Sequence, residues 1–125
     1  MLKRIAFLAA LGYSIALAAV SLMTLKDLPD IEINFADKIF HFLAYSLFTV
    51  LWYFTFFHTF TFKKRRSIVY AVVLAILFGI VIEVLQDTMT ASRALDVYDA
   101  LANTLGALVA AMIIWFKNSF YVKNY

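Results

Sequence analysis

The sequence of 125 residues lacks cysteine and contains few charged residues. Without cysteine, the chain has no disulfide, no thiolate zinc site and no cysteine nucleophile. Charged residues make up 15% and apolar residues 65% of the chain, whereas a soluble domain has about a quarter charged and about half apolar residues. With a mean hydropathy of +0.88, this composition is typical of a protein that lies in a lipid bilayer.

Several classes of functional segment are also missing. The chain holds three glycines and one proline, Pro29, and no glycine-rich loop that would cradle a phosphate. No serine stands out as a nucleophile, and there are no internal repeats. The net charge of +3 is small, and nothing in the sequence indicates nucleic-acid binding.

Four apolar runs, separated by short polar segments, dominate the chain. They cover about residues 5–25, 39–62, 67–85 and 97–116. Each has about 19 to 24 residues, which is the length that a helix needs to cross a hydrocarbon core of ~30 Å. Only helices and closed barrels satisfy the backbone in lipid, and these runs are too long for barrel strands. The sequence therefore predicts an all-α bundle of four transmembrane helices, forming one domain over residues 1–125.

The basic residues predict how the bundle is oriented. If the four spans alternate, eight of the eleven basic residues fall on one side and only Lys26, Lys38 and Arg93 on the other. The positive-inside rule then places both termini and the basic turn 63–66 in the cytoplasm. All eight acidic residues fall on the outer side. We expect a multi-pass protein of the cytoplasmic membrane.

The N-terminal run has an alternative interpretation. A basic start, an apolar run and the segment Ala16-Leu17-Ala18 resemble a cleavable signal peptide. The apolar run continues to Leu25, which favours a helix that stays in the membrane. Cleavage would leave the other three spans in place.

Polar residues gather near one predicted end of three spans. Such residues are costly inside a membrane, so their positions indicate function. Lys38, His41 and Tyr45 share one helix face by their spacing, and similar stripes end the third run and begin the fourth. Because these three ends lie on the same side, we expect the stripes to meet. The predicted site residues are Asp37, Lys38, His41, Glu83, Gln86, Arg93, Asp96, Asp99 and Asn103.

These residues allow more than one chemistry. Nitrogen and oxygen ligands for a divalent metal are offered by His41, Glu83, Asp96 and Asp99, although no H-E-x-x-H pattern is present. His41 with a carboxylate could also act as a general acid and base.

Binding of an anion is the other option. Lys38 and Arg93 could hold an anionic headgroup, with Gln86 and Asn103 orienting the substrate or a water molecule.

A purely structural role is the competing interpretation. Buried ions in lipid must be paired, so Lys38 and Arg93 could simply neutralise carboxylates and hold the helices together. Either way, the sequence predicts an ion pair between one cation (Lys38 or Arg93) and one carboxylate (Glu83, Asp96 or Asp99). Gly106 is interpreted as a point of close helix packing.

The order of these motifs resembles the VanZ-like family. The residues that carry the resemblance are Asp37-Lys38-x-x-His41 with Tyr45, then Glu83-x-x-Gln86, then Arg93-x-x-Asp96-x-x-Asp99-x-x-x-Asn103-x-x-Gly106. Val109 and Ala110 occupy a region where the family often has a further glycine. The resemblance implies a small bacterial multi-pass membrane protein of the cell envelope. The founding member of the family is associated with low-level resistance to the glycopeptide teicoplanin.

Two functions are therefore expected. In the first, the protein binds or modifies an envelope lipid or an anionic lipid-linked precursor at the outer leaflet, with a possible link to glycopeptide resistance. In the second, it is a non-enzymatic interaction module in the membrane, and its polar cluster is a structural ion-pair network. Transport of a small ion is less favoured, because four short helices leave little room for a path.

Overall fold

Helices form every regular element in the computed structural model, which describes residues 2–22, 34–89 and 97–123. The helices are α1 (Leu2–Leu22), α2 (Asn34–Phe54), α3 (Lys64–Met89) and α4 (Val97–Lys123). A short π-helical segment, η1 (Thr55–Thr59), continues α2. The predicted all-α bundle with four membrane-crossing helices is thus confirmed.

Each long helix contains an apolar span of the length that crosses a bilayer. The spans are Lys3–Leu22, Lys38–Thr59, Lys64–Leu85 and Tyr98–Lys117, with 20 or 22 residues each, or about 30–33 Å of helix. Helices α2, α3 and α4 extend beyond the expected apolar runs, to Asn34, Met89 and Lys123. The helices therefore continue into the polar segments that flank the apolar spans. The change from apolar to polar side chains, and not the end of the helix, marks where each span stops.

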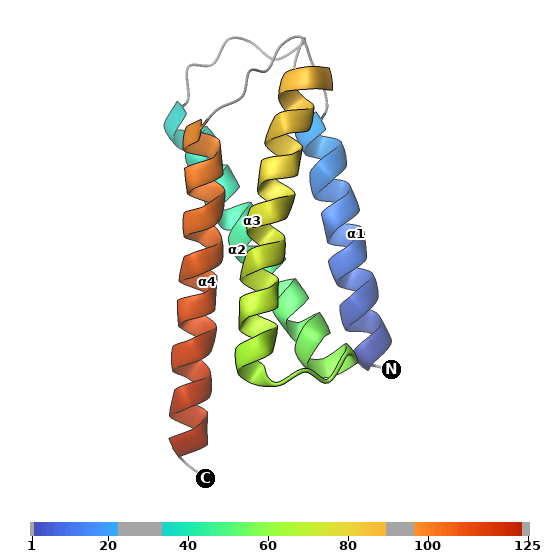
Figure 1. Cartoon of the computed structure of the whole chain (residues 1–125), viewed down its shortest axis with the longest axis vertical. Helices are drawn as coiled ribbons and strands as arrows, with labels where there is room; N and C mark the ends of the chain where they lie inside the picture. The colour runs from blue at the N-terminus through green and yellow to red at the C-terminus, as the bar shows by residue number, and fades with distance from the viewer. Residues whose placement is uncertain (1, 23–33, 90–96, 124–125) are drawn as a thin grey trace.

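The helices alternate in direction, and both termini lie at the same end of the bundle (Figure 1). The turn that joins η1 to α3 lies at that end too, with the basic residues 63–66. Helix α2 crosses behind α3, packing along α4, while η1 packs against α1. The opposite end holds the end of α3 and the beginnings of α2 and α4, where the polar site is predicted.

Small side chains hold the helices close together, as expected where no hydrophobic effect drives association. The buried residues include Ala10, Ala71, Ala75 and Ala107, while many large apolar side chains point outward, toward the lipid. Helices α2 and α4 pack closely at Gly106, where an added Cβ atom would collide with the backbone oxygen of Phe42. Its predicted role in close packing is confirmed.

Hydrogen bonds donated by side chains join the helices. Ser46 Oγ of α2 donates to the backbone oxygen of Gly106 at 2.9 Å. Trp52 Nε1 donates to Ser14 Oγ at 2.9 Å, and Thr55 Oγ1 of η1 donates to the Ala6 oxygen at 3.1 Å. These bonds position α1 and α4 on opposite flanks of α2, and so determine what surrounds the polar end.

Candidate functional site

Side chains from α2, α3 and α4 converge at the polar end of the bundle, where the spans of α2 and α4 begin and the span of α3 ends. Side chains on a helix lean toward its N-terminus. Those of α2 and α4 therefore lean toward the polar end, and Glu83 on α3, which runs the other way, leans back toward the bundle interior. This geometry brings together five of the predicted residues, here called the polar cluster: Lys38, His41, Glu83, Asp99 and Asn103.

An ion pair joins α2 to α4 within the polar cluster. Lys38 Nζ lies 2.5 Å from Asp99 Oδ1, so the predicted pairing of a cation with a carboxylate is confirmed. The lysine side chain is 26% exposed and the aspartate side chain only 7%. Asp99 also lies in the first turn of α4, where the helix dipole favours a negative charge. The carboxylate is thus held inside the bundle, with the ammonium at its edge.

His41 contacts α4 through both ring nitrogens. Nδ1 lies 2.9 Å from Asn103 Oδ1, and an amide oxygen accepts but cannot donate, so Nδ1 donates this hydrogen bond. Nε2 lies 3.5 Å from Asp99 Oδ2, which is longer than the usual N–H···O hydrogen bond. The imidazole is buried. Its orientation is therefore determined by Asn103, and Nε2 faces the carboxylates.

Glu83 adds a second buried carboxylate, from α3. One ligand atom each of His41, Glu83 and Asp99 can be chosen so that all lie within 4.8 Å of one another. All three residues are buried. This set includes three of the four residues predicted as metal ligands, and the fourth, Asp96, lies outside the described residues.

Below these groups, Gly79 leaves room for two polar side chains. A Cβ atom at Gly79 would lie 3.0 Å from Asn103 Nδ2 and 3.3 Å from the Tyr45 ring. The Tyr45 ring also stacks on that of His41, with 6.5 Å between ring centroids. Tyr45 Oη and Asn103 Nδ2 are buried, and neither has a hydrogen-bond partner among the residues that the structure describes.

Some predicted site residues fall outside this description. Arg93 and Asp96 lie outside the described residues, as do the side chains of Asp37 and Gln86 on α2 and α3. Gly79 was not expected at the site at all. A glycine one turn before a buried glutamate, within an otherwise apolar span, is the sequence signal that could have indicated it.

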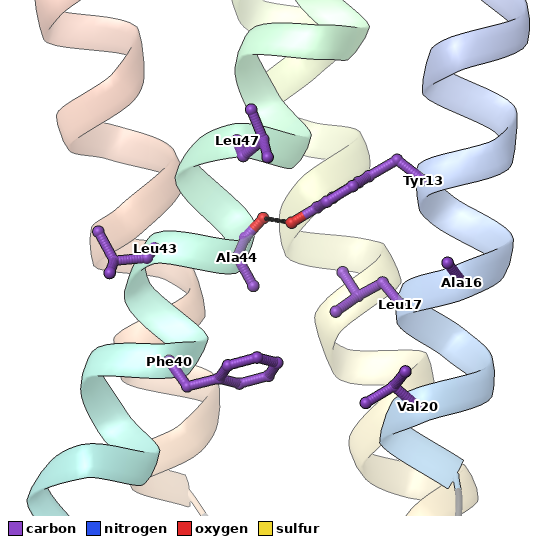
Figure 2. A pocket seen from close by; sticks show the side chains of 8 residues that line it. All are labelled: Tyr13, Ala16, Leu17, Val20, Phe40, Leu43, Ala44 and Leu47. Atoms are coloured by element: carbon purple, nitrogen blue, oxygen red, sulfur yellow. Dashed lines mark hydrogen bonds between the residues drawn. The ribbon is translucent and has the colours of Figure 1, made fainter.

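An apolar groove lies beside the polar cluster, between α1 and α2 (Figure 2). Its volume is about 380 Å³, and it is lined by Tyr13, Ala16, Leu17, Val20, Phe40, Leu43, Ala44 and Leu47. The Tyr13 hydroxyl donates to the Ala44 oxygen at 2.5 Å, so the polar atom of this lining is already bonded. The Phe40 ring meets the His41 ring edge-on at 5.9 Å, so the groove and the polar cluster are neighbours.

Comparison with protein families gives a match over most of the chain. The family model described as VanZ/LLP1 matches residues 4–118, which include all four spans except Lys3 and every residue of the polar cluster. No curated protein and no solved structure matches the chain significantly.

Proposed function

Because the chain belongs to the VanZ/LLP1 family of membrane proteins, we propose that its polar cluster binds the anionic headgroup of a membrane lipid or of a lipid-linked envelope precursor. The site lies at the outer leaflet of a bacterial cytoplasmic membrane, with both termini in the cytoplasm. This orientation follows from the uneven distribution of basic residues.

One observation carries the proposal: two buried donors lack a hydrogen-bond partner among the described residues, namely Asn103 Nδ2 in the polar cluster and Tyr45 Oη, whose ring stacks on His41. Leaving such a group unsatisfied costs about 1–3 kcal/mol, and buried polar groups in native proteins are nearly always bonded. In a cluster that only held helices together, every buried donor would have a hydrogen-bond partner within the protein. N–H and O–H donors of this kind are suited to the oxygens of a phosphate.

Lys38 is placed to attract that phosphate. Its side chain reaches the edge of the bundle, while Asp99 stays inside. An ammonium group has three N–H donors, so Lys38 can contact a headgroup and Asp99 together. The groove between α1 and α2 would take an acyl chain of the same lipid, since its lining is apolar and it adjoins the cluster through Phe40.

Modification of the bound lipid would extend this role. His41 Nε2 faces Asp99, and an imidazole beside a carboxylate is suited to moving a proton to or from a bound water or headgroup. Asn103 holds the ring in the orientation that this requires.

The alternative is a non-enzymatic module in which the polar cluster only joins the helices. The ion pair of Lys38 with Asp99 favours it, because this pair links α2 to α4 without any ligand.

The test is a titration of the purified chain with short-chain lipids, monitored by native mass spectrometry. The probes are anionic phosphatidylglycerol, zwitterionic phosphatidylcholine and a polyprenyl phosphate, the last representing lipid-linked precursors. We expect the anionic probes to bind more tightly. Lys38→Met should weaken them about 10- to 100-fold, the value of a charge-assisted hydrogen bond, and leave phosphatidylcholine unchanged.

The matched control is Lys117→Met, which removes an exposed lysine from the opposite end of the same bundle. Equal weakening by both variants would mean that only overall charge matters, and the proposal would be rejected. It would also be rejected if a folded Lys38→Met, Asp99→Leu double variant bound the anionic probes like wild type, because the cluster would then be structural. In cells, comparing the teicoplanin sensitivity of strains that express wild type with that of strains that express the double variant tests the link to glycopeptide resistance.

A further inference from the structure

We infer that His41, Glu83 and Asp99 form a binding site for one divalent transition-metal ion, Zn²⁺ or Mn²⁺. The inference rests on the proposed function in one respect, since it places the ion where the headgroup binds. Its ligands come from three different helices, and all are buried.

The spacing of the ligand atoms fits a metal ion. Ligands of a tetrahedral Zn²⁺, at about 2.0–2.1 Å from the ion, lie about 3.4 Å from each other. His41 Nε2 and Asp99 Oδ2 are 3.5 Å apart, which is long for a hydrogen bond but close to this value. The complete set lies within 4.8 Å, so a small movement of the flexible Glu83 side chain would complete the arrangement.

Two of the proposed ligands, His41 and Asp99, have neighbouring side chains of the kind that orient the ligands in metal sites. A metal-binding histidine almost always donates its other ring N–H to a carbonyl or carboxylate oxygen, which orients the ring. Asn103 Oδ1 accepts such a bond from Nδ1 of His41 at 2.9 Å, so Nε2 faces the carboxylates. On Asp99, Lys38 holds Oδ1, and Oδ2 turns toward His41. In both His41 and Asp99, a bond to one side-chain atom therefore orients the ligand atom beside it.

The ligand types select the class of ion. An imidazole with two carboxylates suits Zn²⁺ or Mn²⁺, whereas Ca²⁺ and Mg²⁺ prefer sites made of oxygen ligands alone. Three protein ligands leave a position for water or a substrate oxygen, as in catalytic zinc sites. A phosphate oxygen of the headgroup would fit there. The ion would then serve the proposed function as the main receptor for the anion.

The experiment measures metal uptake by the full chain without lipid. Untagged protein in detergent is stripped with a chelator and dialysed. Calorimetric titration with Zn²⁺ and Mn²⁺ follows, and elemental analysis gives the stoichiometry. We expect one ion per chain. His41→Gln, Glu83→Gln and Asp99→Asn should each weaken binding by ~100-fold or more, since even loss of an outer partner costs ~10–100-fold, the range that we expect for Asn103→Leu.

The chain supplies its own control, because it has only two histidines and no cysteine. His58 stacks on Phe54 and belongs to η1, next to the turn at the opposite end of the bundle, so His58→Gln should bind metal like wild type. Binding that survives His41→Gln, or that is lost in His58→Gln, would overturn the inference, as would a wild-type protein that takes up neither ion.

Two further results keep the conclusions separate. If a ligand variant does not fold, pulsed EPR of Mn²⁺-loaded His58→Gln protein with ¹⁵N-labelled histidine decides the matter. A coupled imidazole nitrogen would come from His41 and support the site, and its absence would refute it. Anionic lipid binding without metal uptake would refute the metal site alone. Metal uptake without lipid binding would leave the metal site standing and reject the proposed function.

Discussion

Removing the two members of the Lys38–Asp99 pair should have unequal effects on stability. Asp99 is buried inside the bundle, whereas Lys38 is 26% exposed at its edge. Lys38→Met leaves a buried carboxylate without its cation, for which losses of ~3–5 kcal/mol are typical in soluble cores. We expect Lys38→Met to lose about 3 kcal/mol of stability, because the partial exposure of Lys38 weakens its ion pair with Asp99.

Asp99→Leu should cost less. The lysine that remains can extend along its four-carbon chain toward the membrane surface and stay hydrated. We therefore expect a loss of roughly 1 kcal/mol, near the upper limit for exposed ion pairs. The double variant Lys38→Met, Asp99→Leu should lie closer to wild type than Lys38→Met does, because apolar pairs of similar volume replace buried ion pairs at little cost.

Reversible unfolding in mixed detergent micelles measures the free energy of unfolding of wild type, both single variants and the double variant. The coupling energy from this cycle isolates the interaction of the two side chains. If Asp99→Leu were as damaging as Lys38→Met, the assignment of inner and outer partners would be incorrect. A double variant no more stable than the worse single variant would show that the pair does not act as a unit.

Two further predictions concern packing and orientation. Gly106→Ala should destabilise the bundle by about 1–3 kcal/mol, since the new methyl group meets the backbone at Phe42. The control is Gly12→Ala, because an added Cβ atom at Gly12 has nothing within 4 Å. Its free energy of unfolding in the same assay should stay within about 0.5 kcal/mol of wild type. Reporters fused after residue 125 and within the turn 63–66 should both indicate the cytoplasm, as the basic residues predict, and an outer signal from either position would reverse the orientation.

The amino-acid sequence alone determined the fold class and the end of the bundle at which the polar cluster lies. Four apolar runs of membrane-crossing length leave few alternatives, because lipid cannot satisfy an open backbone. Helical periodicity places His41 one turn below Lys38, and Asn103 one turn below Asp99. The need to pair a buried ion also made a contact between one of two cations, Lys38 or Arg93, and a carboxylate predictable.

Only the tertiary structure decided which partners meet. Sequence left Lys38 a choice among three carboxylates, and the packing of α2 against α4 selected Asp99. The same packing paired His41 with Asn103, a residue 62 positions away. Gly79 acquired its place below the cluster in the same way. The physical reason is that periodicity determines which residues share a face, whereas the rotation and crossing of helices depend on side chains that interlock from distant parts of the chain.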